Sequence, residues 1–184
     1  MFGHYCYLWL RNKNCLRLPI GITRRYKNIA CMITLNEGDK APVFKGIDQN
    51  GNKVSLTDFK GKKVALYFYP EDDTPTCTIQ ACNLRDNYLL LKQHGIEVIG
   101  VSPDDEKSHK KFETKFQLPF TLIADGKHKI LDQYGVWGEK QMFGNHYMGV
   151  YRTTFLIDEK GKIKKIIKKP KNKEHAEEIV KAWK

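Results

Sequence analysis

A short apolar segment runs directly into a turn that carries two cysteines, and this junction constrains the fold more than any other part of the chain. Residues 63–69 read KVALYFY, a continuous apolar run that is typical of a central strand covered on both faces. Pro70 ends the run. Thr74 and Pro75 then have the pattern of a helix N-cap followed by proline at the first helical position. The junction therefore predicts a buried strand that leads at once into a helix.

Strand and helix patterns alternate along the rest of the body. The expected helices cover residues 75–93 (closed by Gly95), 102–116, 127–134 and 173–183, and the expected strands cover 63–69, 96–101, 121–124, 152–157 and 162–168. A chain of 184 residues is long enough for one domain with a proper core. Strands separated by helices, followed by a hairpin and a last helix, predict an α/β layered domain with a central mixed sheet flanked by helices.

The first 33 residues differ from the rest in composition. Residues 1–36 contain six basic residues and no acidic residue, which is the signature of an organelle-targeting presequence. A secretory signal is a second interpretation, although basic side chains interrupt any apolar core. A true start at Met32 is the third, and it is favoured because the sequence after it reads as a natural domain opening. We expect residues 1–31 to be poorly ordered and the domain to cover 34–184.

The net charge of +11 and the cysteine count limit the function classes. Surface lysine explains the charge better than a nucleic-acid surface does, because residues 160–173 alternate Lys with Ile as a strand face would and lack aromatic stacking platforms. No apolar run approaches 18 residues, so no membrane span is expected. Five cysteines, three of them scattered in the leader, do not form a secreted disulfide framework. We therefore expect a cytoplasmic protein that binds neither nucleic acid nor membrane.

Cys77 lies in the first turn of the expected helix. Free backbone N–H groups and the positive end of the helix dipole face a side chain at this position, and both favour a thiolate. An ordinary cysteine is only about 3% ionised at pH 7, and only the thiolate attacks an electrophile such as a peroxide. Thr74 is placed to bring a hydroxyl beside the sulfur, and Pro70 to form a pocket wall. Alternatively, Thr74 is only the N-cap of the helix and Pro70 only ends the strand.

Cys82 follows Cys77 by five residues. On an unbroken helix the two Cα atoms are roughly 8.6 Å apart, whereas a disulfide requires less than about 7 Å. The two cysteines can therefore bridge only if the start of the helix unwinds. The alternative is that Cys82 is a small buried apolar residue.

These residues carry a resemblance to a known family. The segment from Pro70 to Cys77, PEDDTPTC, resembles the peroxiredoxin signature, and the segment ACNLRD around Cys82 is similar to the bacterioferritin-comigratory-protein (PrxQ) branch. GDKAP at 38–42 and RTTFLID at 152–158 match the same family. The resemblance covers about residues 34–184. It implies a thioredoxin-like fold and a thiol peroxidase that reduces hydrogen peroxide and organic hydroperoxides with electrons from thioredoxin or a similar dithiol.

The resemblance also implies roles for single residues. Cys77 is the peroxidatic cysteine that becomes a sulfenic acid, and Cys82 is the resolving cysteine that forms an intramolecular disulfide with it. Arg152 is the active-site arginine, and Thr74 and Pro70 take the family's pocket roles. An intrachain pair implies a monomer, and no cofactor or metal is expected. The family usually has Gly at the position of Thr76, so the preference for small or bulky peroxides stays open.

Two other readings of the cysteines compete with this one. A thioredoxin-like dithiol-disulfide oxidoreductase normally uses C-x-x-C, whereas Cys77 and Cys82 have four residues between them. A structural zinc site needs more ligands than two cysteines, and the histidines show no paired spacing with them. We expect each of these histidines to be a surface or turn residue: His94, His109, His128, His146 and His175.

Overall fold

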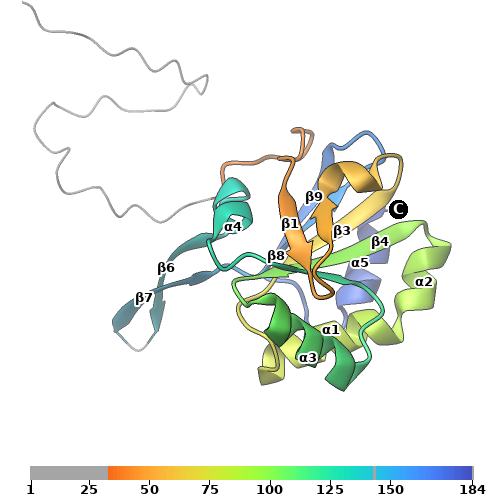
Figure 1. Ribbon diagram of the computed structural model, residues 1–184. Helices are drawn as coiled ribbons and strands as arrows, with labels where there is room; N and C mark the ends of the chain where they lie inside the picture. Colours follow the sequence, from red (N-terminus) through yellow and green to blue (C-terminus); the bar gives the residue numbers. More distant parts are fainter. Residues whose placement is uncertain (1–32, 143, 184) are drawn as a thin grey trace, which may run out of the picture.

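The computed structural model describes residues 33–142 and 144–183, which form a seven-stranded sheet between helices and a separate hairpin (Figure 1). The order of the strands in the sheet is β2-β1-β5-β4-β3-β8-β9. The bounds are β1 (Lys45–Asp48), β2 (Lys53–Ser55), β3 (Lys63–Phe68), β4 (Ile96–Ser102), β5 (Thr121–Ala124), β8 (Thr153–Ile157) and β9 (Ile163–Lys168). β3 and β5 are parallel to β4, and the other pairs are antiparallel. The expected central mixed sheet is confirmed.

Helices cover both faces of this sheet. They are η1 (Leu56–Phe59), α1 (Pro75–Asp86), α2 (Tyr88–Gln93), α3 (Glu106–Phe116), α4 (Lys129–Gln133) and α5 (His175–Trp183). Ala65 and Tyr67 of β3 pack into the core that includes side chains of α1, α2, α3 and α5. Leu66 and Phe68 pack into the opposite core, with α4 and η1. Both faces of β3 are therefore buried, as its unbroken apolar run predicts.

The expected helices over 127–134 and 173–183 are each shorter at one or both ends, and the other two expected helices differ more. The helix expected over 75–93 is wrong as one element, because Asn87 separates α1 from α2 and its side chain donates to the Asn83 carbonyl over 3.0 Å. The helix expected from residue 102 begins only at Glu106. Its N-cap is Asp105, whose carboxylate accepts a hydrogen bond from the backbone N–H of Ser108.

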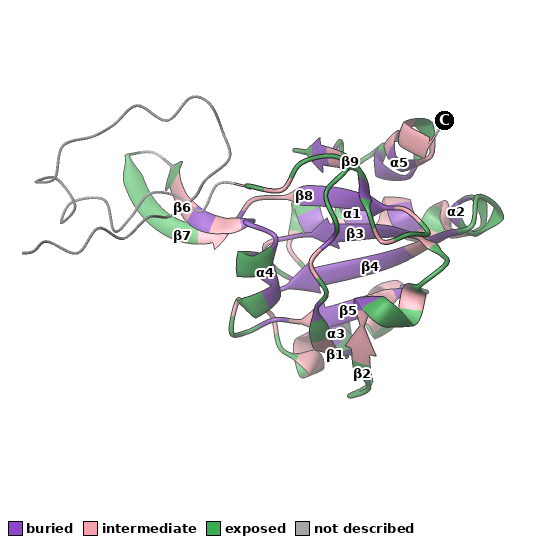
Figure 2. Cartoon of the chain, turned by 90° about the horizontal axis from the view of Figure 1, so that it is seen from above, coloured by how far each residue is buried: buried purple, intermediate pink, exposed green. Residues whose placement is uncertain are grey.

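A hairpin that the sequence patterns did not indicate projects from the body of the molecule. β6 (Trp137–Met142) pairs with β7 (Asn145–Val150), and both are drawn apart from the sheet in Figures 1 and 2. Figure 2 also shows that burial is concentrated in the central strands β3, β4 and β8, whereas β7 is mostly exposed.

Two remaining expectations concern the ends of the chain and the membrane. The expectation of poor order in residues 1–31 lies outside the described residues. None of the helices within 33–142 and 144–183 has the length and apolar character needed to cross a membrane.

Candidate active site

Cys77 lies at the junction that the sequence singled out. α1 begins at Pro75, and Thr74 is its N-cap residue with extended backbone angles. Cys77 is thus the third residue of the helix, in the turn whose backbone N–H groups have no helical partner. Its side chain is 2% exposed and packs against the core that Tyr67 and Tyr69 of the preceding segment also enter. The strand, turn and helix expected from the sequence are all present.

Arg152 reaches Cys77 from a distant part of the sequence. It immediately precedes β8, whose first residue, Thr153, lies opposite Phe68, the last residue of β3. Because the two strands are antiparallel, the start of β8 meets the end of β3, from which the chain leads to α1. The Arg152 Nη2 group donates to the Cys77 sulfur over 3.1 Å. The structure therefore brings together the two residues that the resemblance paired.

Three further buried side chains extend this contact, and the sequence reasoning did not find them. The Arg152 Nη1 group donates to Gln80 Oε1. The Gln80 side-chain nitrogen lies 3.1 Å from His175 Nδ1, and His175 Nε2 lies 2.8 Å from the Thr154 hydroxyl. Gln80 follows Cys77 by three residues, a spacing that places both on one helix face and could have pointed to it.

The expectation that His175 is a surface or turn residue is wrong. Its side chain is 0% exposed, because it opens α5 where that helix packs against α1. Burial and the nearby Arg152 charge lower the pKa of His175 to about 3. His175 is therefore neutral at physiological pH.

Thr74 and Pro70 lie on the loop that precedes α1. The Thr74 side chain does not cap the helix, contrary to expectation, and its hydroxyl donates to the Glu71 carbonyl over 3.2 Å. The expected contact of this hydroxyl with the Cys77 sulfur is thus not made in this state. Pro70 is half-buried just beyond the end of β3.

A buried polar network holds the same loop. The Asp72 carboxylate accepts hydrogen bonds from the Tyr69 and Ser108 hydroxyl groups and pairs with His109 Nδ1, each over 2.8 Å. The Asp72 backbone N–H donates to the Asp104 carboxylate over 3.0 Å. These contacts fasten the loop before α1 to the start of α3.

His109 is also fully buried, so its expected surface or turn position is wrong. Burial by itself would lower the pKa of His109, but the hydrogen bond and charge of Asp72, with further contributions from the Ile123 carbonyl and Asp104, raise it above its ordinary value. Asp72, Asp104 and His109 offer ligand-type atoms within 4.8 Å of one another. Since these groups already bind one another, we interpret them as a hydrogen-bonded network.

Cys82 lies further along the same helix and is half-buried. Both cysteines are free thiols, and α1 continues unbroken between them. The structure therefore represents the reduced state, in which the helical separation expected from the sequence is present.

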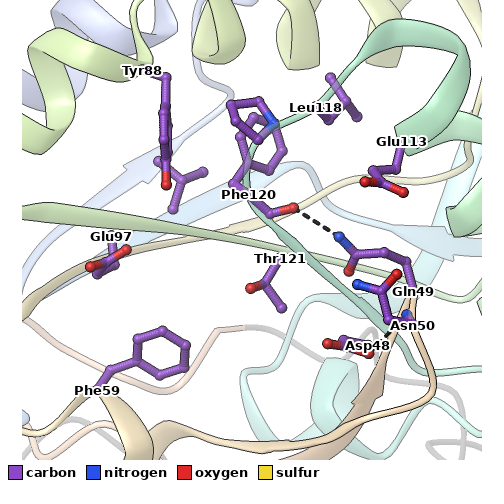
Figure 3. A pocket seen from close by; sticks show the side chains of 12 residues that line it. Asp48, Gln49, Asn50, Phe59, Tyr88, Glu97, Glu113, Leu118, Phe120 and Thr121 are labelled. Carbon is purple, nitrogen blue, oxygen red and sulfur yellow. Dashed lines mark hydrogen bonds between the residues drawn. The ribbon is translucent and has the colours of Figure 1, made fainter.

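Two cavities differ in their relation to these residues. A cavity of about 700 Å³ opens beside Arg152 and is bordered by Lys140, Tyr151 and Lys168, among others. The pocket drawn in Figure 3, of about 300 Å³, has an acidic lining that includes Asp48, Glu97 and Glu113, and Gln49 donates to the Phe120 carbonyl within it. Neither cysteine lines the second pocket, so it is separate from the cysteine site.

Known proteins are similar to this chain over most of its length. Residues 37–166 match the AhpC/TSA family. Peroxiredoxin Bcp of Escherichia coli strain K12 is 45% identical over 152 residues, which cover 83% of this chain and 97% of the relative. The chain is a peroxiredoxin of the AhpC/TSA family. Peroxiredoxin Bcp of Bacillus subtilis strain 168 is 43% identical with the same coverage.

Solved structures of peroxiredoxins have the same fold. Peroxiredoxin Q of Xanthomonas campestris superimposes with a TM-score of 0.72 at 30% identity, covering 76% of this chain and 89% of that chain. A PrxQ mutant of Xylella fastidiosa gives a TM-score of 0.76 at 28% identity, covering 81% and 95%. The expected thioredoxin-like fold and the Bcp/PrxQ branch are thus confirmed. As a peroxiredoxin, this protein is a thiol peroxidase that acts on hydroperoxides.

Proposed function

We propose that Cys77 is the peroxidatic cysteine of this peroxiredoxin. The observation that carries the proposal is the guanidinium of Arg152, 3.1 Å from the Cys77 sulfur at the start of α1. The thiolate is the reactive form of a cysteine, and Arg152 places a fixed positive charge beside this sulfur.

The first step is a displacement at oxygen. The Cys77 thiolate attacks one oxygen of the hydroperoxide, the O–O bond breaks, and a sulfenic acid forms while the second oxygen leaves with the electron pair. The leaving oxygen takes up a proton to become water or an alcohol. Arg152 supplies fixed donors where charge moves in the transition state. We assign to Thr74 the orientation of the peroxide, after its hydroxyl leaves the Glu71 carbonyl, and to Pro70 the wall of the pocket.

The second step uses Cys82 as the resolving cysteine. Its thiol attacks the Cys77 sulfenic acid, a disulfide forms, and water leaves. Because an unbroken helix holds the two Cα atoms roughly 8.6 Å apart and a disulfide requires less than about 7 Å, α1 must unwind between the cysteines. A thioredoxin-type dithiol then reduces the disulfide by thiol exchange and is itself oxidised. Both thiols belong to one chain, so the proposed cycle operates in a monomer.

A thiol count tests the roles of the cysteines. One equivalent of hydrogen peroxide should remove two thiols from the reduced protein and leave Cys77 and Cys82 in one disulfide-linked peptide. In C82S the same treatment should produce a sulfenic acid at Cys77 that dimedone traps. C77S is the matched control and should not consume peroxide. Survival of the Cys77 thiol in wild type, or rapid peroxide consumption by C77S, would refute the assignment.

A further inference from the structure

His175 belongs to a line of buried contacts that begins at the Cys77 sulfur and ends at Thr154. From Cys77 the contacts run to Arg152, to Gln80, to His175 and finally to Thr154. Gln80, His175 and Thr154 are each 0% exposed. The proposed attack on peroxide uses only the first of these contacts, so the remaining contacts require a separate explanation.

The donors and acceptors along this line determine the orientation of the Gln80 amide and the tautomer of His175. A guanidinium only donates, so the oxygen of the Gln80 side chain must face Arg152. The amide nitrogen then faces His175 and donates to Nδ1, which must be an unprotonated acceptor. The single ring proton of neutral His175 is therefore on Nε2 and is donated to the Thr154 hydroxyl. A change at His175 thus removes the constraint that keeps the Gln80 oxygen directed at Arg152.

The position of Gln80 on α1 adds a second consequence. Gln80 lies between Cys77 and Cys82, in the part of the helix that must unwind before the disulfide forms. Asn83, one turn later, binds the start of α5 through the Ala176 N–H and the Lys173 carbonyl, both at 2.9 Å. Unwinding as far as Cys82 breaks the contact of Gln80 with His175 and can leave the Asn83 contacts in place.

We propose that His175 is a positioning residue that, through Gln80, holds Arg152 against Cys77 and keeps the first turns of α1 helical until Cys77 is oxidised. The inference rests on the proposed roles of Cys77 and Cys82. Because His175 is the first residue of α5, the proposal gives this helix an influence on the relative rates of sulfenic acid formation and disulfide formation. Loss of the contact slows the attack on peroxide, because Arg152 is less well held, and speeds disulfide formation, because the helix opens more easily.

Two substitutions of similar size separate this role from simple packing. In H175N the side-chain oxygen takes the place of Nδ1 and still accepts from Gln80. In H175Q the amide nitrogen takes the place of Nε2 and still donates to Thr154, but no acceptor faces Gln80. Both variants lose the same ring and its packing against Tyr67, whose centroid lies 6.0 Å from that of the imidazole.

The two steps are measured separately. In a C82S background, stopped-flow peroxide consumption gives the rate of sulfenic acid formation. With Cys82 present, acid quenching and mass analysis give the rate of disulfide formation. We expect H175Q to slow the first rate by roughly five- to tenfold, as expected for one weakened hydrogen bond, and to speed the second severalfold. H175N should retain most of both rates.

The outcomes distinguish the alternatives. Equal effects of H175N and H175Q, no effect of either, or a slowing of both steps by H175Q would overturn the proposal and leave His175 as a packing residue. If H175Q does not fold, Q80L removes the same contact from the other side and should give the same pair of opposite changes. Failure of the proposed function is recognised independently, because C77S would then still consume peroxide.

Discussion

Arg152 donates a hydrogen bond to the sulfur of Cys77 over 3.1 Å, although 75 residues separate the two in sequence. The contact depends on the antiparallel pairing of β8 with β3, which places the start of one strand beside the end of the other. The same guanidinium binds Gln80 on α1. In the proposed mechanism the cation is thus held in place before a peroxide arrives, so little reorganisation would be needed when charge moves.

Removal of this guanidinium should slow the reaction with peroxide. We expect R152A to lower the second-order rate constant for hydrogen peroxide by about 10²- to 10³-fold, the loss that accompanies removal of one fixed donor. R152K should recover little, because one ammonium group cannot reproduce a fork that binds both Cys77 and Gln80. Stopped-flow measurement in a C82S background gives the rate. The control is K168A, because Lys168 is exposed and borders the same cavity as Arg152. Equal effects of R152A and K168A would contradict the proposed role of Arg152.

The Asp72 network should make a large contribution to stability. D72N keeps the shape of the side chain but removes the buried negative charge that pairs with His109, and we expect a loss of about 2–4 kcal/mol in the free energy of unfolding. The measurement is urea denaturation at pH 7. Because Asp72 lies on the loop before α1, the rate of peroxide reduction should fall as well.

The neighbouring Asp73 provides a matched control for this substitution. Its carboxylate pairs with Lys115 over 2.6 Å, but both side chains are largely exposed. Its φ of 54° lies in the left-handed region, which asparagine adopts readily. D73N should therefore cost less than about 1 kcal/mol. Similar losses in D72N and D73N would show that burial of the network is unimportant.

Acid should destabilise the fold through His175. The folded pKa of about 3 lies below the ordinary value of 6.5, so between these values the unfolded chain binds a proton that the folded chain does not. The stabilisation is complete above pH 6.5 and decreases by about 1.4 kcal/mol for each pH unit below it. Between pH 6.5 and 5, the free energy of unfolding of wild type should fall by about 2 kcal/mol more than that of H175N, because H175N has no imidazole at position 175 to take up a proton. Parallel pH profiles of the two proteins in urea denaturation would contradict this.

Gly100 should not tolerate even a methyl group. It lies on β4 directly opposite Tyr67 of β3, and a Cβ at this position would be 2.8 Å from both Cζ and the hydroxyl of Tyr67. We expect G100A to lower the free energy of unfolding by about 1–3 kcal/mol. G126A is the control, since the nearest atom, a Pro103 carbonyl oxygen, would be 3.5 Å away. Equal melting temperatures for the two variants would refute the expectation.

Local patterns predicted most of the elements but not their interruptions. The apolar runs identified β3, β4 and β5, and Thr74 with Pro75 marked the start of α1. The break at Asn87 was missed because its side chain competes for a backbone carbonyl inside an otherwise helical pattern. The β6–β7 hairpin was missed because most of β7 is exposed and shows no apolar alternation.

The residues of the candidate site likewise fall into those that a local pattern predicts and those that it does not. Pro70, Thr74, Cys77 and Cys82 belong to one segment, so their spacing was sufficient to find them. Nothing adjacent to His109 and His175 in sequence indicates burial, so the local pattern predicts a surface or turn position for both. Their partners, Asp72 and Gln80, lie 37 and 95 residues away.

The sequence by itself determined the strand, the turn and the helix start that present Cys77, because hydrophobic run, proline position and helix capping act over a few residues. It also determined the spacing at which Cys77 and Cys82 can form a disulfide only if α1 unwinds between them. Only the tertiary structure decided which side chains surround the sulfur. Sheet pairing brought Arg152 to it, and the packing of α5 on α1 buried His175 against Gln80. Such contacts depend on the order of strands and the docking of helices, which a local pattern does not contain.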